Sequence, residues 1–287
     1  MSAEAAGADP EPTDAAAGGR DTDGMAAPVV AIVPTLGQRL DTLEEALGSI
    51  ATQRVRVRIV VVAPREAPGL AEVVERWGGE LVEDPGSGLS AAMNAGLRAA
   101  AGERWYLWLN DDDLLRPGGL AVLLELAQAH PDAPVVYGGC DYIDPQGRRF
   151  GANRAGRLAA FVLPWGPDLV PMPASLTSVE AARAAGGYDE ALRYAMDFDL
   201  LLRLRRQGPF AATRQVVAAF RWHPTSLTVA NRRASVREAE AVKRRYLPRM
   251  LRPVSWVWHL PVRAATFAAA WVVQRRAVRA GSAAAAG

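Results

Sequence analysis

The sequence has little of what defines disulfide-rich, fibrous or membrane-spanning proteins. Cys140 is the one cysteine among 287 residues, so no internal disulfide can form, and a single thiol fits a reducing compartment. No apolar signal-peptide core stands near the N-terminus. The most apolar late stretch, residues 253–279, is interrupted by Arg263 and is too short without charge for a span of roughly 20 residues. The composition is therefore that of a globular protein.

The N-terminal end of the chain has few basic residues, and the C-terminal end has few acidic ones. Residues 1–27 hold six acids and one base, for a net charge of −5, and almost no large apolar side chains, so we expect a disordered lead. Residues 231–287 hold twelve Lys or Arg and two Glu, for a net charge of +10. The basic C-terminal end, which also carries Trp256, Trp258 and Trp271, favours contact with an anionic membrane surface or packing on the domain.

Short apolar runs alternate with helical patterns through the first half of the chain. Asp41 is the expected N-cap of the first helix, with Glu44 three residues later. Alternation of this kind indicates βαβ units and a parallel sheet covered on both faces. The expected strands are 29–33, 58–62, 80–83 and 104–109, and the expected helices are 41–50, 70–77 and 90–101.

The second half is less regular. A Gly138-Gly139 pair separates two short expected strands, and residues 151–175 are rich in proline and predict loops. The further expected elements are strands at 135–137, 141–143 and 216–222 and helices at 179–185 and 197–206.

Three consecutive aspartates follow the fourth expected strand, in the stretch YLWLNDDDLLRPGG from Tyr106 to Gly119. Adjacent carboxylates repel one another unless a cation, a donor network or water offsets their charge. Mg²⁺ or Mn²⁺ prefers such oxygen ligands and commonly binds substrate phosphates as well. Because ligands of parallel α/β sheets bind beyond the carboxyl ends of the strands, this run predicts a metal site. A solvated acidic turn is the alternative.

Two later stretches carry further candidate residues. In GYDEALRYAMDFDLLLR, Asp197 and Asp199 open a helix, where one of them is expected to cap it and the other to act as a general base. In FRWHPTSLT, His223 lies at a strand end beside Arg221, where it is either structural or a contact for phosphate or metal.

Taken together, these stretches resemble the family 2 glycosyltransferases of the GT-A fold. The resemblance covers roughly residues 28–230. It rests on VVAIVPTLGQRLDTLEEALGSIATQ, EDPGSGLSAAMNAGLRAAAGERWYLWLNDDDLLRPGGL, GGYDEALRYAMDFDLLLRL and FRWHPTSLT, which occur in the family's order. The resemblance implies an α/β GT-A domain at 28–230, with a Rossmann-like, mostly parallel sheet and flanking helices. A basic helical extension is expected at 231–287.

The resemblance also implies roles for particular residues. Asp197 would be the catalytic base. Asp112, Asp113 and His223 would bind the metal, Mn²⁺ or Mg²⁺. The nucleotide-sugar would be bound by Pro34, Thr35, Asn94, Asp111, Asp112 and His223. Asn110 and Met196 stand where relatives commonly have Asp and Glu, and Val62-Ala63-Pro64-Arg65 replaces an acidic turn that contacts the nucleotide base, so the nucleotide is left open.

The implied activity is an inverting, metal-dependent transfer of a sugar from a nucleotide-diphosphate sugar to a hydroxyl of a glycan, polysaccharide or lipid-linked acceptor. We expect a cytoplasmic protein, peripheral on the inner face of the membrane through its C-terminal extension. The alternatives are a non-catalytic nucleotide-sugar-binding or scaffold protein and a nucleotidyltransferase, although Pro34 to Arg39 is a poor match to a phosphate-binding loop. We expect no nucleic-acid partner, because the core is mildly acidic and no aromatic-basic platform is present.

Overall fold

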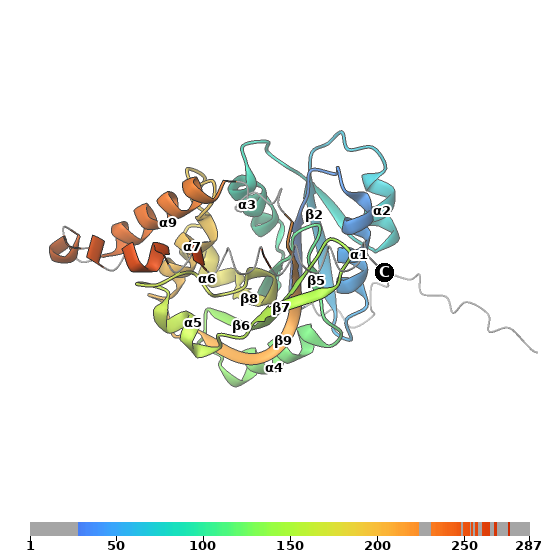
Figure 1. The fold of residues 1–287 in the computed structure, drawn as a ribbon. Helices are drawn as coiled ribbons and strands as arrows, with labels where there is room; N and C mark the ends of the chain where they lie inside the picture. Colours follow the sequence, from blue (N-terminus) through green and yellow to red (C-terminus); the bar gives the residue numbers. More distant parts are fainter. Residues whose placement is uncertain are drawn as a thin grey trace, which may run out of the picture.

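The computed structural model describes residues 28–223 and 231–247, and beyond them 249–252, 254, 256–257, 260–264, 267–268 and 275. A sheet runs through the middle of the molecule and helices cover both of its faces (Figure 1). The predicted lead at 1–27 and the part of the late histidine loop after His223, residues 224–230, lie outside the described residues.

The described residues form one nine-stranded sheet in the order β3-β2-β1-β4-β8-β6-β9-β5, with β7 paired to β6. Strands β3, β2, β1 and β4 are parallel to one another, β8 is antiparallel to both of its neighbours, and β6 and β9 are again parallel. The predicted, mostly parallel α/β sheet is therefore confirmed. The strands are β1 (Val29–Pro34), β2 (Val57–Ala63), β3 (Glu80–Glu83), β4 (Trp105–Trp108), β5 (Leu114–Leu115), β6 (Val135–Ile143), β7 (Arg149–Asn153), β8 (Ser175–Ser178) and β9 (Ala211–Arg221).

The helices bury the two faces of this sheet in two separate cores. Alternate residues of β1 serve each one: Val30 and Ile32 face a core with α3, α5, α6 and α7, while Val29, Ala31 and Val33 face a core with α1, α2 and α4. This explains why the strand is apolar at every position. The helices are α1 (Leu40–Ala51), α2 (Leu70–Arg76), α3 (Leu89–Ala99), α4 (Gly119–Ala129), α5 (Arg157–Val162), α6 (Val179–Ala184), α7 (Met196–Leu204) and α9 (Arg232–Tyr246), with 3-10 turns at Met172–Ala174 and Arg249–Leu251.

The strand break predicted for the second half of the sheet was wrong. Gly138 and Gly139 do not separate two strands but lie inside the continuous strand β6. A Cβ on Gly138 would lie 2.7 Å from Val217 Cγ2 and 3.0 Å from Gln215 O, so glycine is needed where the irregular register brings β9 close. The stretch 151–175, expected to be rich in loops, also holds the end of β7 and the whole of α5.

The N-cap prediction for the first helix was also wrong. Helix α1 begins at Leu40, its N-cap is Arg39 without a side-chain cap, and Asp41 lies inside the first turn. A carboxylate there still favours the positive end of the helix dipole. The shift matters for the site, because it leaves Arg39 at the junction of the β1–α1 loop and the helix.

Helix α9 of the basic extension packs against α7 of the core. Val242 is fully buried in the core that contains α7, Tyr246 Oη donates to Asp199 at 2.8 Å, and Arg245 pairs with Asp189 at 3.0 Å. The domain boundary expected between residues 230 and 231 therefore stays a prediction, and α9 packs against the expected domain at 28–230. None of the helices in the described part of the chain is long and apolar enough to cross a membrane.

Candidate active site

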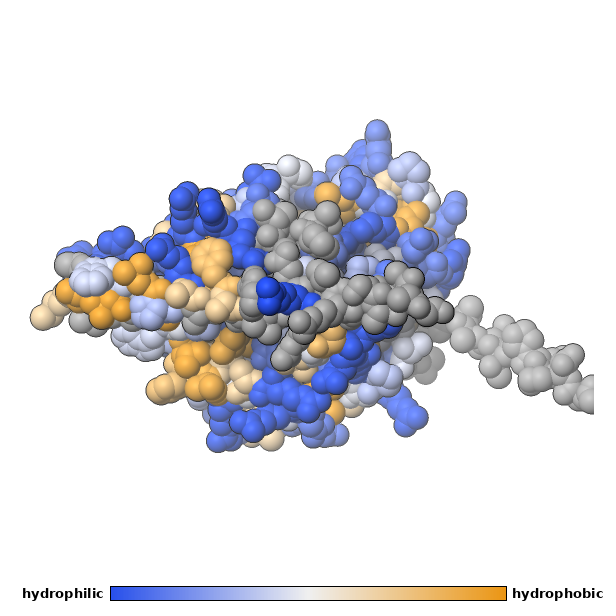
Figure 2. Space-filling view, in the orientation of Figure 1, coloured by the Kyte–Doolittle hydropathy of each residue, from blue (hydrophilic) through white to orange (hydrophobic). Residues whose placement is uncertain are grey.

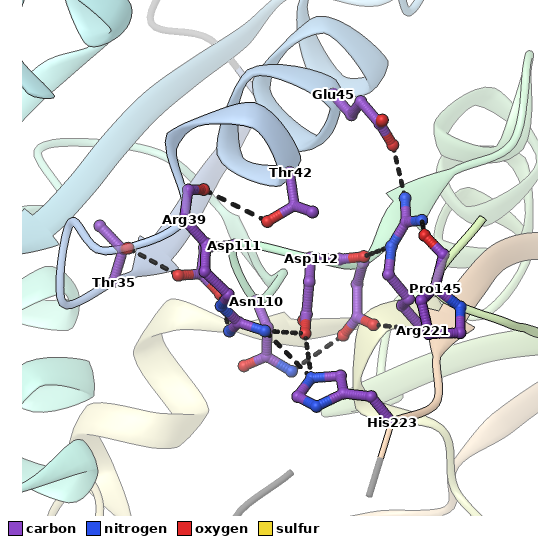
Figure 3. A network of polar contacts seen from close by, with 11 residues as sticks. Thr35, Arg39, Thr42, Glu45, Asn110, Asp111, Asp112, Pro145, Arg221 and His223 are labelled. Carbon is purple, nitrogen blue, oxygen red and sulfur yellow. Dashed lines mark hydrogen bonds and ion pairs between the residues drawn. The ribbon is translucent and has the colours of Figure 1, made fainter. Parts of the chain in front are cut away.

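The loop after β1 and the aspartates after β4 meet at the same edge of the sheet. Thr35 directly follows β1, and its hydroxyl donates to Asp111 Oδ2 at 2.6 Å. Arg39, at the start of α1, donates to Asp111 Oδ1 at 2.6 Å (Figure 3). Both oxygens of Asp111 are thus engaged, and its side chain is 9% exposed. Burial raises the pKa of Asp111, and Thr35 and Arg39 oppose that rise.

Asp112 faces the histidine that the sequence placed at the end of β9. Its Oδ2 lies 2.8 Å from His223 Nε2 and accepts a hydrogen bond from Arg39 at 2.7 Å, and Arg39 also lies 3.0 Å from His223 Nε2 (Figure 3). Two residues predicted from motifs 111 positions apart are therefore in direct contact. Asp112 Oδ2 is the atom on which the cluster converges.

Asp113 has a different environment from its two neighbours. Its side chain is fully buried, Oδ1 accepts from the backbone N–H of Arg221 at 2.9 Å, and Oδ2 accepts from the Asn110 amide at 2.8 Å. Burial, with the charge of Asp112 adding to it, raises the pKa of Asp113 to about 8. A buried carboxylate with both oxygens engaged does not meet a cation without rearrangement, so this geometry does not support the prediction that Asp113 binds metal.

Arg221 holds the backbone of the aspartate run at Asp112. The sequence indicated Arg221 only as a neighbour of His223. It is buried, and its guanidinium donates to the carbonyls of Asp112 and Pro145 and to the carboxylate of Glu45 (Figure 3). The like-charged aspartates can therefore lie side by side because Arg39 neutralises Asp111 and Asp112, while Arg221 donates to the Asp112 carbonyl and to the Asp113 carboxylate. Each of the three has its own partners.

The two aspartates at the start of α7 also separate into two environments. Asp199 is buried and engaged by Arg203 at 2.8 Å and by the Tyr246 hydroxyl at 2.8 Å. Asp197 accepts a hydrogen bond from the N–H group of Phe198 at 2.7 Å. Neither aspartate is the N-cap, which is Ala195. Partial burial raises the pKa of Asp197 to about 6, the nearby charge of Glu238 adds to it, and the Phe198 N–H opposes it.

Asp197 lines a cavity of about 240 Å³ between α7 and α9. Four more charged side chains line it, and the apolar part of the wall comes from residues such as Phe198 and Ala239. Burial lowers the pKa of Lys243, and the carboxylate of Asp168 opposes that effect. The other charged residues of the wall are Asp168, Glu240, Lys243 and Arg263.

Glu238 of α9 holds the turn that leads into α7. Its Oε1 accepts hydrogen bonds from three consecutive backbone N–H groups, those of Arg193, Tyr194 and Ala195, at 2.9, 3.0 and 3.2 Å. Asp197 lies two residues after Ala195, the last of these three donors. Neither Glu238 nor Lys243 was singled out from the sequence, because the contact joins segments more than forty residues apart and no motif carries it.

The remaining predicted residues occupy less direct positions. Pro34 ends β1 beside β2 and is buried. The Asn94 amide is bonded to the backbone N–H and carbonyl of Tyr188 and to Glu190, so it joins α3 to the loop before α7. That loop also contacts β4, because the Tyr188 ring meets the Trp108 ring edge-on at 5.6 Å. A nucleotide-sugar role for Asn94 stays a prediction.

The donor set at Asp112 and His223 fits a divalent cation in part. A carboxylate oxygen and an imidazole nitrogen are suitable ligands for Mn²⁺, and such ions commonly keep waters and bind substrate phosphates to complete their shell. The described residues contain no cluster of three or more His, Cys, Asp or Glu side chains arranged to hold a metal. The pair therefore suits a cation whose remaining ligands come from a diphosphate and water.

Two solved structures share this architecture. S. aureus TarS in complex with UDP-GlcNAc superposes with a TM-score of 0.61 over 78% of this chain and 69% of its own, at 14% identity. A mannosyltransferase from Pyrobaculum calidifontis in complex with GDP-Man and Mn²⁺ superposes with a TM-score of 0.60 over 91% of this chain and 81% of its own, at 22% identity. The fold expected from the sequence, the GT-A fold of glycosyltransferases, is therefore confirmed.

Sequence comparison gives the family. The sequence model described as Glycosyl transferase family 2 matches residues 30–182, just over half of the chain. The chain therefore belongs to glycosyl transferase family 2.

Two curated relatives are longer proteins. An uncharacterized glycosyltransferase of Rickettsia felis is 22% identical over 208 residues, which are 68% of this chain and 34% of that protein. An uncharacterized protein of Sinorhizobium fredii is 32% identical over 120 residues, which are 40% of this chain and 12% of that protein. The chain thus spans about a third or less of these relatives.

Proposed function

We propose that this glycosyltransferase transfers a sugar from a nucleotide-diphosphate sugar to an acceptor hydroxyl with inversion at the anomeric carbon, and that it uses Mn²⁺ or Mg²⁺. The observation that carries the proposal is the contact between Asp112 and His223 at the carboxyl edge of β4, beside Thr35. The site lies where α/β sheets bind ligands, and its donors suit a metal–diphosphate.

The residues have separate tasks in this proposal. Asp112 and His223 would hold the divalent cation, which, when bound, offsets the charge that develops on the leaving diphosphate. Thr35, Asp111 and Pro34 would form the wall beside which the nucleoside lies, with Thr35 and Asp111 joined by their hydrogen bond. Asp197 would accept the proton of the acceptor hydroxyl, because a carboxyl with a pKa of about 6 is ionised at neutral pH and still a usable base.

The cavity beside Asp197 is the proposed site of the acceptor. It carries both acidic and basic groups, Asp168, Lys243 and Arg263 among them, above an apolar wall. Such a lining suits a sugar ring, whose hydroxyls bond to charged groups while its C–H face packs on apolar side chains. We propose a glycan or lipid-linked acceptor on this basis.

The direct test is release of nucleoside diphosphate from a panel of UDP- and GDP-sugars, with and without Mn²⁺. The panel starts from UDP-GlcNAc and GDP-Man because they are bound in the similar solved structures. Asp197→Asn should lose turnover by about 10²–10⁴-fold while it still binds nucleoside diphosphate. Equal turnover by Asp197→Asn and wild type would remove Asp197 as the base.

We also propose that the protein contacts an anionic membrane surface. Phe161 of α5 and Trp256 of the C-terminal part are 75% and 61% exposed, and Leu158 and Leu260 are exposed beside them in sequence. Figure 2 shows apolar surface gathered at the end of the molecule that carries α5 and the C-terminal segments. Exposed aromatic residues with nearby arginines, such as Arg157 and Arg263, are typical of interfacial segments.

Cosedimentation with vesicles tests this part. Full-length protein should bind vesicles that contain anionic lipid and bind less at high salt. The double variant Phe161→Ser/Trp256→Ser should bind weakly. If this variant and wild type partition equally, membrane contact at these two residues is refuted.

A further inference from the structure

Arg39 is a cation that the protein itself supplies to the proposed metal site. Its guanidinium forms ion pairs with Asp111 at 2.6 Å and Asp112 at 2.7 Å and lies 3.0 Å from His223 Nε2 (Figure 3). The oxygen that it contacts on Asp112 is Oδ2, the same atom that faces His223. The best-placed metal ligand is therefore already engaged by a positive charge.

The two partners differ in their freedom to move. The Asp111 and Asp112 side chains are 9% and 8% exposed and lie on a short turn after β4, whereas the Arg39 side chain is 44% exposed. Arg39 also sits at the end of the β1–α1 loop, where its own side chain caps nothing. A long, half-exposed arginine can leave its partner at a smaller cost than the buried aspartates can.

A guanidinium and a divalent cation cannot both bind Asp112 Oδ2 well. Each would bring positive charge within a few ångströms of the other, and the guanidinium is never deprotonated. A diphosphate changes this balance, because its oxygens match the planar fork of an arginine. Arg39 could then remain paired with Asp111 and turn its second N–H group to the ligand.

We propose that Arg39 competes with the divalent cation for Asp112 and couples metal binding to nucleotide binding. The metal binds weakly by itself, because Arg39 must leave Oδ2. It binds tightly together with a nucleoside diphosphate, because the diphosphate accepts Arg39. Coupling of this kind is reciprocal, so metal also raises the affinity for the nucleotide by the same factor. The inference rests on the proposed metal and diphosphate site.

The test is a Mn²⁺ titration, read from the free-ion EPR signal, on full-length protein without and with a nucleoside diphosphate, UDP or GDP. Arg39→Gln should bind Mn²⁺ alone about five- to tenfold more tightly than wild type, and the gain in Mn²⁺ affinity on adding nucleotide should shrink. Arg76→Gln is the matched control, since Arg76 of α2 pairs with Glu44 on the exposed surface. It should behave as wild type.

Two further measurements distinguish loss of the competition from loss of the metal site or of the fold. Asp112→Asn should abolish Mn²⁺ binding in both backgrounds, and circular dichroism should show that each variant is folded. Equal or weaker Mn²⁺ binding by Arg39→Gln, in a folded sample, overturns the competition. If no variant binds Mn²⁺ but nucleoside diphosphate still binds, the inference fails and a metal-independent transferase remains. If neither ligand binds any variant, the proposed function itself fails.

Discussion

Removal of the Glu238 carboxylate should loosen the turn that positions Asp197. In Glu238→Ala, the backbone N–H groups of Arg193, Tyr194 and Ala195 lose their common acceptor. A hydrogen bond to a charged group contributes roughly 1.5–3 kcal/mol, but these three share one oxygen and one of them is at the exposed surface, where water replaces it. We therefore expect a loss of about 2 kcal/mol in the free energy of unfolding.

Thermal unfolding measures this loss. For a chain of this size, about 2 kcal/mol corresponds to a drop in Tm of about 4–8 °C. Glu75→Ala is the matched control, because Glu75 lies exposed on α2 and its replacement should change the free energy of unfolding by no more than about 0.5 kcal/mol. Glu238→Ala should also lower kcat more than it changes the affinity for nucleoside diphosphate, because the turn carries Asp197 rather than the aspartate run.

A Glu238→Ala variant as stable and as active as the control would refute this reasoning. It would mean that α9 lies on α7 without holding it. A variant that is destabilised but keeps full kcat would separate the two claims, and would leave Glu238 a structural residue with no influence on Asp197.

Three other predictions follow from the buried groups. Activity should fall about tenfold per pH unit below pH ~6, where Asp197 becomes protonated. Glu238→Gln should move this acidic limb of the pH–rate profile to lower pH, because the charge of Glu238 raises the pKa of Asp197. A limb that does not move would contradict the assignment of Asp197 as the base. Because the folded-state pKa of Asp197 is raised from 3.8 to about 6, wild type loses stability as pH rises between these two values, and the loss is complete above pH 6. Asp197→Asn should therefore be more stable than wild type by about 1–3 kcal/mol at pH 8 but not at pH 4, as measured by urea unfolding. Gly119→Ala should destabilise by about 1–3 kcal/mol, although helix propensity alone predicts a gain, because its Cβ would lie 2.2 Å from Val217 O; a raised urea midpoint would refute the close packing of α4 on β9.

The fold was predictable from the sequence where the local pattern of apolar and polar residues determines the secondary structure. Runs such as Val29–Pro34 are apolar at every position because both faces of the strand are buried, and that pattern is visible without any structure. The strand break expected at Gly138 and Gly139 failed for the opposite reason. These glycines respond to β9, which is distant in sequence, and a local turn signal is indistinguishable from a close-packing requirement.

The site divides in the same way. Asp112, His223 and Thr35 were predictable because each stands at the end of an expected strand, and the sheet brings those ends together. Arg39 and Glu238 were not, since an arginine in a loop and a glutamate on a charged helix have the sequence appearance of solvated side chains. Their roles appear only once the chain places them against carboxylates and backbone N–H groups.

The most direct test of the central claim is the thermal shift of wild type and Asp112→Asn with UDP and GDP, each with and without Mn²⁺. A ligand that binds only the folded protein raises its stability. We predict that one nucleoside diphosphate raises the Tm of wild type in the presence of Mn²⁺, and that the shift is lost in Asp112→Asn. No shift with either nucleotide, in a folded wild-type sample, would contradict a metal–diphosphate site at Asp112 and favour a scaffold that keeps the fold without the chemistry.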